Sequence, residues 1–363
     1  MRSAAEQPTA RKERPHNVES SFDELDIAIV DALRSAPRVS WQNLAPVLGV
    51  DPATVGRRWS RMHSEGAAWV TAHPAGSATP SCALVEITCV PGLSGTVADV
   101  LADDIEAATV KLTSGARDMM VLAQAPDFAT LSAYLLNRVV HVSGVTNVRS
   151  HIVTQSALEA SRWREGALSP EQRQLLHPGS KSRPDEGTAL KSPDRRIIRA
   201  LNTDGRMPFE RIAERVNLSP VAVRRRLTRL EDAGLVIYRC DTSRHVSGHA
   251  IAAVYFGSLD LQDLAGAEGR IRTVPGVRAC TVVAGPHNVL IDAWLRSTAE
   301  THDLERRLRG VLPTLEIRDR SIVLRTVKLL GRVLDAEGRS VRSVPLLTEQ
   351  ATLHGDHGSD VAL

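Results

Sequence analysis

Residues 194–234 read DRRIIRALNTDGRMPFERIAERVNLSPVAVRRRLTRLEDAG, and residues 26–66 read DIAIVDALRSAPRVSWQNLAPVLGVDPATVGRRWSRMHSEG. The two stretches align without a gap at an offset of 168 positions, and twelve of their 41 positions are identical. At an offset of 170, Gly115 aligns with Gly285 further along the chain. The chain therefore consists of one unit that is present twice. The long period excludes a solenoid, because solenoid repeats have a period of roughly 20–50 residues.

Each of these stretches is typical of three helices. Apolar residues recur at the three- and four-residue spacing of a buried helical stripe. In the first copy Gly49 suits a tight turn, and Asp51, followed by proline, is a strong helix N-cap. In the second copy Asn217 takes the turn and Ser219, followed by proline, is the cap. Two short helices joined by a tight turn indicate a helix-turn-helix motif, whose second helix enters the major groove of DNA.

The third helix of each copy carries an arginine-rich face. Burial of Val223, Leu227 and Leu230 turns the opposite face of the second copy outward. The expected DNA-binding residues are Val221, Arg224, Arg225, Arg226, Thr228 and Arg229 in the second copy, and Thr54, Arg57, Arg58 and Arg61 in the first. A run of arginines is often only a solvated helix face. Repetition of Arg-Arg-x-x-Arg at the same place in both copies favours DNA, with flanking arginines on phosphates.

Other repeated polar residues have a structural interpretation. Asp26 with its equivalent Asp194, and Arg38 with Arg206, are expected to cap a helix or fix a turn.

The two copies differ in charge, although the whole chain carries only +3. Residues 191–234 hold 11 Lys+Arg against six Asp+Glu, which gives +5. Residues 22–66 hold five against six, which gives −1. The second copy is therefore expected to supply more of any salt-dependent affinity for DNA.

The rear part of each copy has the period of strands. Residues 82–90 and 250–258 are apolar strands, and each is followed by a helix, two strands joined by a glycine turn, a second helix and a last strand. The helices are expected at about 95–103 and 127–140, and at 260–272 and 299–309. The order β-α-β-β-α-β is the ferredoxin-like arrangement. The predicted fold class is α+β, with a winged helix-turn-helix followed by a ferredoxin-like βαββαβ domain, the pair present twice.

The expected organisation has seven segments. They are a disordered tail (1–20), a first winged helix-turn-helix (21–74), a first α/β domain (80–155), a linker (156–188), a second winged helix-turn-helix (189–242), a second α/β domain (248–332) and a second disordered tail (336–363). The linker is rich in Pro, Gly and Ser and is expected to be largely disordered, apart from a helix near 155–165.

With these motifs in place, the chain resembles the Lrp/AsnC family of bacterial transcription regulators over about 22–155 and 190–330. The first copy departs from the family pattern where Trp59, Met62 and His63 replace the usual end of the third helix. The resemblance implies that the α/β domains drive dimerisation and bind a small effector, commonly an amino acid, near a Gly-x-x-Asp turn.

The effector-binding residues implied by the resemblance are Gly115, Arg117 and Asp118 in the first copy, and Gly285, His287 and Asn288 in the second. Asp118 can pair with an ammonium group, and backbone N–H groups of the turn can hold a carboxylate. The alternative is an ordinary hairpin turn, because such turns favour Gly with Asn or Asp.

Other classes of protein lack support in the sequence. No stretch reaches the roughly 18 apolar residues of a membrane span, and the polar N-terminus lacks a signal-peptide core. The four cysteines form no C-x-x-C pair, and no nucleotide-binding or hydrolase motif is present. We therefore expect a cytoplasmic protein without metal or cofactor.

The sequence predicts a duplicated Lrp/AsnC-like regulator that acts without catalysis. Its expected partners are double-stranded DNA, a small effector such as an amino acid, and further copies of the chain in a homo-oligomer. Two alternatives stay open. Siroheme decarboxylases have a similar architecture, occur as fused pairs and need no arginines on the third helix. An amino-acid sensor that does not bind DNA would also keep the α/β domains.

Overall fold

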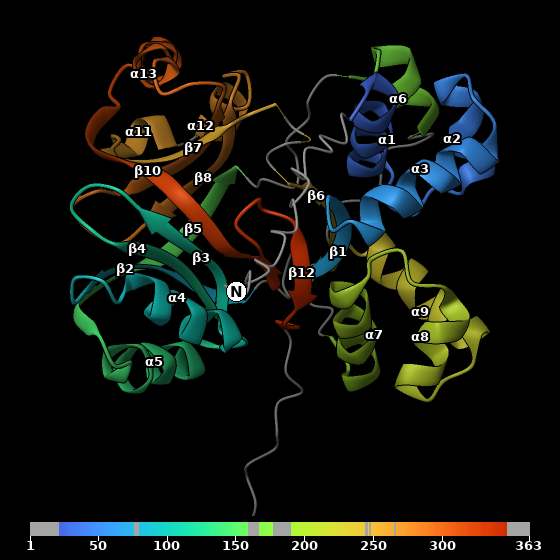
Figure 1. The fold of residues 1–363 in the computed structure, drawn as a ribbon, viewed down its shortest axis with the longest axis horizontal. Helices are drawn as coiled ribbons and strands as arrows, with labels where there is room; N and C mark the ends of the chain where they lie inside the picture. The colour runs from blue at the N-terminus through green and yellow to red at the C-terminus, as the bar shows by residue number, and fades with distance from the viewer. Residues whose placement is uncertain are drawn as a thin grey trace, which may run out of the picture.

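The computed structural model describes residues 22–75, 80–158, 167–176, 190–243, 246, 248–264 and 266–346. The two helix-turn-helix units lie together on one side of the molecule, and the strands and helices of the two α/β halves form the other side (Figure 1). The wing strands lie between these two parts. The expected N-terminal tail falls outside the described residues, as does the chain beyond 346.

The third helix of each helix-turn-helix unit begins at the cap that the sequence predicts, and the turn before it lies at the predicted residue. Ser40 and Asp51 cap the second and third helices of the first unit, and Ser219 caps the third helix of the second. Gly49 and Asn217 take left-handed backbone conformations between these helices. The first unit comprises α1 (Glu24–Ser35), α2 (Trp41–Leu48), α3 (Pro52–Ser64) and wing strand β1 (Ala68–Pro74). The second comprises α7 (Ser192–Thr203), α8 (Phe209–Val216), α9 (Pro220–Asp232) and wing strand β6 (Val236–Thr242).

Each wing strand pairs with the wing of the other copy. β1 and β6 form a two-stranded antiparallel sheet, in register from Ala68 opposite Thr242 to Pro74 opposite Val236. The backbone hydrogen bonds of each wing are therefore satisfied by the other half of the chain.

A reciprocal arginine pair, Arg38 and Arg206, also joins the two helix-turn-helix units. Arg38 Nη1 donates to the carbonyl of Gly205 at 2.6 Å, and Arg206 Nη1 donates to the carbonyl of Pro37 at 2.6 Å. The guanidinium of Arg206 lies 3.9 Å from the centre of the Trp41 ring. Burial, together with the nearby charge of Arg38, lowers the pKa of Arg206 to about 10. Each arginine thus fixes a turn of the opposite copy rather than its own.

The first α/β half follows the predicted order of elements. It comprises β2 (Ser81–Cys89), α4 (Ser94–Asp103), β3 (Ala107–Thr113), β4 (Met119–Ala125), α5 (Phe128–Asn137), a short 3-10 helix (Val139–His141) and β5 (Val145–Leu158). The second half comprises β7 (Ile251–Ser258), α11 (Leu261–Leu264), α12 (Ala267–Ile271), β8 (Val277–Val283), β9 (Val289–Leu295), α13 (Glu300–Val311) and β10 (Glu316–Leu329). The helix expected over 260–272 is two short helices, because Gly266 between them has a φ of +81°, which interrupts a right-handed helix.

The strands of the two halves form one continuous sheet that closes on itself. Its order is β10-β3-β4-β2-β5-β8-β9-β7, and β7 pairs again with β10. Within the barrel, the last strand of each half therefore pairs with one strand of its own half and one of the other: β5 with β2 and β8, and β10 with β7 and β3. The result is a barrel that neither half can complete alone.

Three hydrophobic cores stabilise this arrangement. Each half has a core between its strands and its own helices, with Ile87 and Leu131 in the first and Ile291 and Leu304 in the second. A third core fills part of the barrel interior from both halves and includes Phe256, which is 1% exposed. Burial of such a side chain contributes about 1.5–3 kcal/mol.

Two segments expected to be disordered carry structure. Helix α6 (Pro170–Leu176), within the linker, packs on the first helix-turn-helix unit, and Gln172 Nε2 donates to the carbonyl of Val47 at 2.8 Å. Its start is a capping box, since the Ser169 side chain accepts from the Gln172 N–H and the Gln172 side chain accepts from the Ser169 N–H. The helix expected near 155–165 is not found over its first residues, because β5 continues to Leu158, and residues 159–166 lie outside the described part.

The segment after the barrel also carries secondary structure. Strands β11 (Arg332–Leu334) and β12 (Ser340–Ser343) form a hairpin beside β10. The N–H of Ser340 donates to the carbonyl of Gly66 at 2.8 Å, and a side chain at position 66 would collide with the Ser340 backbone. This C-terminal hairpin therefore ties the barrel to the first helix-turn-helix unit. Among the described helices, none is long and apolar enough to cross a membrane.

Candidate nucleic-acid interface and glycine turns

Helix α9 presents the predicted DNA-binding face to solvent. Val221 is 78% exposed, and Arg224, Arg225 and Thr228 are exposed on the same helix. Neither Arg224 nor Arg225 forms an ion pair with any residue that the structure describes. The Arg224 guanidinium instead lies 5.0 Å from the ring centre of Phe209, whose face favours a cation.

Helix α3 offers fewer such groups. Arg57 is exposed without an ion pair among the described residues, and Thr54 is half-buried with its hydroxyl donating to Asp51 at 2.6 Å. Trp59 is buried, and its ring stacks on His63 at 5.9 Å between centres. The end of α3 is therefore held by aromatic packing.

The flanking arginines of both helices pair with a buried carboxylate. Arg58 and Arg61 contact Asp26, and Arg226 and Arg229 contact Asp194, with Nη2 of Arg61 and of Arg229 each 2.5 Å from its carboxylate. Both aspartates are 0% exposed. Because a buried carboxylate needs compensating charge, these pairs hold the third helix against the first. The sequence predicted a structural role for the aspartates but did not connect them to these arginines.

The two glycine turns place their polar residues in equivalent positions. Asp118 Oδ2 accepts from the Cys89 N–H at 2.8 Å, at the end of β2. Asn288 Oδ1 accepts from the Leu259 N–H at 2.8 Å, just after β7. Gly115 is exposed with a φ of +95°. In each half the turn residue therefore caps the end of the first strand.

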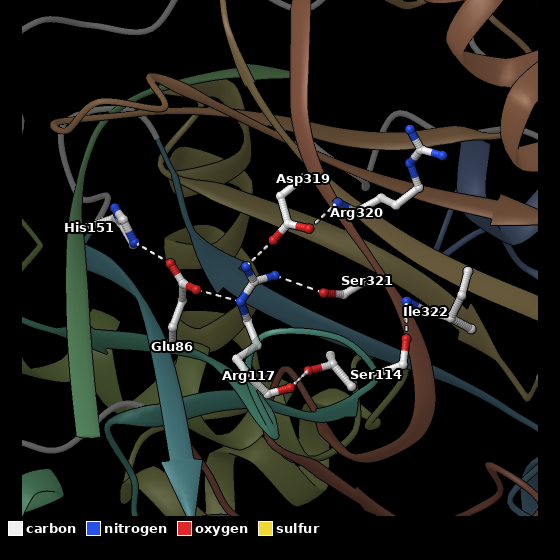
Figure 2. A network of polar contacts seen from close by, with 9 residues as sticks. Glu86, Ser114, Arg117, His151, Asp319, Arg320, Ser321 and Ile322 are labelled. Atoms are coloured by element: carbon white, nitrogen blue, oxygen red, sulfur yellow. Dashed lines mark hydrogen bonds and ion pairs between the residues drawn. The ribbon is translucent and has the colours of Figure 1, made fainter. Parts of the chain in front are cut away.

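Arg117 points away from solvent into a polar network at one end of the barrel (Figure 2). It forms ion pairs with Glu86 of β2 and Asp319 of β10, and its Nη1 donates to the Ser321 hydroxyl at 2.7 Å. His151 of β5 contacts Glu86 at 2.7 Å. The network thus joins both halves of the chain, and Arg117 is only 6% exposed.

The equivalent residues of the second half have different chemistry. At the offset of 170, Arg117 corresponds to His287 and Glu86 corresponds to Phe256. The Phe256 ring lies 4.0 Å from the Arg117 guanidinium, so it forms part of the same network. His287 is half-buried, and its Nδ1 makes no hydrogen bond with any residue in the described part. The network is therefore specific to one of the two turns.

The charge state of Glu86 depends on this network. Burial alone would raise the pKa of Glu86, but the hydrogen bond from His151 and the charge of Arg117 outweigh burial and hold the pKa below its usual value near 4.5. Glu86 therefore contributes stability that is present above about pH 4.5 and is lost as the pH falls through its lowered pKa.

Replacement of Arg117 by methionine should destabilise the protein in a pH-dependent way. The substitution leaves the Glu86 carboxylate buried without its guanidinium, and we expect a loss of about 3–5 kcal/mol in unfolding free energy at pH 7. The deficit should shrink at pH 4, where Glu86 of the variant takes up a proton. Urea denaturation at both pH values measures the difference. Glu86→Gln combined with Arg117→Met should recover part of the loss, and an equal deficit at both pH values would contradict the account.

Comparison with known proteins matches both parts of the chain to one family. The model of the AsnC-type helix-turn-helix domain matches residues 22–63 and 193–231, and the model of the Lrp/AsnC ligand binding domain matches residues 82–163. The HTH-type transcriptional regulator LrpA of Mycobacterium tuberculosis is 32% identical over 138 residues, which are 38% of this chain and 90% of that protein. The leucine-responsive regulatory protein of Rhizobium meliloti is 28% identical over 151 residues, 40% of this chain and 93% of that protein.

Two solved structures match most of the chain. The siroheme decarboxylase NirDL has a TM-score of 0.57 at 12% identity and covers 85% of this chain and 93% of its own. The same enzyme in complex with an iron-uroporphyrin III analogue has a TM-score of 0.55 at 11% identity, with 84% and 93% covered. The prediction that the chain acts without catalysis rested on missing motifs and on the arginines of the third helices. It is wrong as an exclusion, because an enzyme shares this fold over 85% of the chain.

The structure brings together no candidate metal site among the described residues. Within the described ranges, no group of three or more His, Cys, Asp or Glu side chains is placed to hold a metal ion. The features that remain are two exposed third helices, two glycine turns and the ligand-binding-domain match. From these features and the relatives above, the chain belongs to the Lrp/AsnC family.

Proposed function

We propose that the chain is a sequence-specific DNA-binding transcriptional regulator in which α9 is the principal recognition helix. The observation that carries this proposal is the exposed face of α9, where Arg224 and Arg225 have no carboxylate partner among the described residues. Arginine is the side chain best suited to guanine edges and phosphates, and a helix N-terminus adds a favourable dipole.

The arrangement of the two halves supports two recognition helices per chain. The paired wings and the reciprocal pair Arg38 and Arg206 connect one helix-turn-helix unit to the other. Two symmetric units of this kind suit two half-sites on a duplex. Each relative matches about two fifths of this chain over nearly its own whole length. We therefore propose that one chain counts as two of their subunits and that any homo-oligomer is built from such units.

The two helices contribute unequally in this proposal. In α3, Arg57 is the exposed arginine, whereas Arg58 and Arg61 pair with Asp26. The first helix-turn-helix unit also has the lower net charge. We propose that α3 positions the duplex, with Thr54 and Arg57 contacting it, while α9 supplies most of the affinity and the base contacts.

Removal of the two free arginines of α9 should abolish most specific binding. Each arginine contact to a base edge is worth about 1–3 kcal/mol, so Arg224→Ala with Arg225→Ala should weaken specific affinity by about a hundredfold. Fluorescence anisotropy with DNA from upstream of the protein's own gene, against scrambled competitor at two salt concentrations, measures the change.

The matched control for that experiment removes two exposed arginines of α13, Arg306→Ala with Arg309→Ala. This variant loses the same charge far from the helix-turn-helix units and should bind DNA nearly as the wild type does. Equal losses in both variants would mean that only net charge matters, and they would overturn the assignment of α9.

We further propose that the glycine turn of the first half binds an amino-acid effector. The match to the Lrp/AsnC ligand binding domain covers this turn, and Asp118 supplies a carboxylate for an ammonium group. The proposed contacts are the backbone of Gly115 and the Asp118 carboxylate. Arg117 would hold the turn in place through its ion pairs with Glu86 and Asp319. In the second half, the corresponding contacts of Gly285, His287 and Asn288 lack that charge.

Asp118→Asn should remove effector binding without disturbing the fold. The Asn288 amide already caps Leu259 in the equivalent place, so asparagine at position 118 can keep the cap on Cys89. Thermal unfolding of the wild type with L-leucine, as the first of a panel of amino acids, should shift upward, and the shift should vanish in the variant. A shift of the same size in Asp118→Asn would place the effector elsewhere.

A second candidate is a siroheme decarboxylase-like activity, which is favoured by the fold that the chain shares with NirDL. Siroheme would be the substrate, and the reaction releases carbon dioxide from its carboxylate side chains. Incubation of the purified chain with siroheme, followed by mass spectrometry, tests this candidate. A decarboxylated product supports it, and unchanged siroheme with intact, folded protein removes it.

A further inference from the structure

A cavity of about 870 Å³ lies between the barrel and the wing strands. Barrel strands of both halves line it, and the rest of its wall comes from β1, β6 and the hairpin that follows β10. The cavity is at the end of the barrel interior that faces the helix-turn-helix units, because Cys82 and Leu84 of β2 line it while Glu86 belongs to the polar network beyond them. It is therefore separate from both glycine turns.

Equivalent barrel strands of the two halves line the cavity. At the offset of 170, lining residues correspond in pairs, such as Cys82 with Ala252 and Leu84 with Val254. One cavity thus lies across the approximate twofold axis of the chain. In a dimer of identical subunits, the two members of every such pair would be the same residue.

In this chain, four of those pairs differ by a charged group or an indole ring. They are Lys111 with Thr281, Leu122 with Asp292, Gln124 with Trp294, and Gln155 with Arg325. Three charged groups and an indole ring therefore each occur in one half of the wall without an equivalent in the other half. A wall of this kind distinguishes the two ends of one bound molecule.

Charged groups of both signs line the wall, and most of the cations are already paired. Lys111 reaches across the barrel to form an ion pair with Asp292. Arg278 and Arg239 both contact the buried Asp241 of the wing. The lining cations are Lys111, Arg239, Arg278 and Arg325, and the lining acids are Asp292 on the barrel and Asp335 and Glu337 on the hairpin.

Arg325 is the cation that the protein itself leaves available. Its Nε is buried and makes no hydrogen bond with any residue in the described part of the chain, and the structure records no ion pair for it there. A buried guanidinium N–H without an acceptor is costly, and a carboxylate of a bound molecule would satisfy it.

Apolar side chains form much of the remaining wall. Met120, Leu290, Val254 and Ile237 contribute from the barrel and the wing, and the indole of Trp294 carries the Arg278 guanidinium 3.7 Å above its ring centre. The volume falls within the range of about 300–1,000 Å³ that holds drug- and cofactor-sized ligands, and it exceeds what a free amino acid would fill.

From these features we propose that the cavity binds one amphipathic organic carboxylate of cofactor size per chain, with its carboxylate at Arg325 and its apolar body against Trp294 and the barrel wall. The ligand contacts both the barrel and the wing strands, so it joins the α/β part of the chain to the helix-turn-helix part. This site is additional to the proposed effector turn and does not depend on DNA binding.

The first test uses the full chain and the fluorescent anion 8-anilinonaphthalene-1-sulfonate. The wild type should bind one equivalent. Ala279→Trp, which fills the cavity from β8, should abolish this binding, whereas Ala129→Trp on the exposed face of α5 should not. Full binding by Ala279→Trp, or no binding by the folded wild type, would overturn the proposal. Circular dichroism and thermal unfolding establish that each variant is folded.

The second test separates charge from apolar contact. Arg325→Gln removes the charge but keeps a polar side chain, the one found at the equivalent Gln155, and should weaken the anionic probe by about tenfold, the scale of one charge-assisted hydrogen bond. It should leave the neutral relative N-phenyl-1-naphthylamine unchanged. Equal effects on both probes would contradict an anion site. Palmitate, a flexible carboxylate, and cholate, a rigid one, should compete with the probe, and the one whose shape fits the cavity better should compete more strongly. Failure of both to displace the probe at saturation would overturn the assignment of a carboxylate.

Discussion

The structure depends on the last strand of each half, which pairs both with its own half and with the other half. β5 and β10 each complete the sheet of their own half and also pair with β8 or β3 of the other, so the barrel closes only when both halves are present. Closure removes sheet edges that would otherwise be open to aggregation. The wing strands likewise pair between the two halves, as one antiparallel pair. Duplication within a single chain makes this pairing independent of protein concentration.

The sequence predicted the helix-turn-helix units well because their signals are local. Caps such as Ser219, turn residues such as Asn217 and apolar spacing are set within a few residues of one another. Barrel closure was beyond such reasoning, because a strand pattern says which face is buried but not which distant strand is its neighbour. The capping box at Ser169 was a local signal for α6 that a linker composition obscured.

The candidate site shows the same division. Exposure of Arg224 and Arg225 follows from helical periodicity and was predictable. The commitment of Arg226 to the buried Asp194 was not, because a partner 32 residues away enters only through packing. Likewise, the Gly-x-x-Asp pattern located the turns, yet it could not reveal that Arg117 points into the barrel toward Asp319. The cavity arises from both halves together and has no signature in either.

The central claim is that the two halves of one chain pair with each other, and a cross-link between the wings tests it most directly. Val70 of β1 lies opposite Cys240 of β6, so Val70→Cys places two thiols across the wing pair. After mild oxidation, peptide mapping should show a 70–240 disulfide in a species with the mass of one chain, 39.4 kDa. The same disulfide found only in a species of twice that mass would mean that the wings pair between chains, and it would contradict the account.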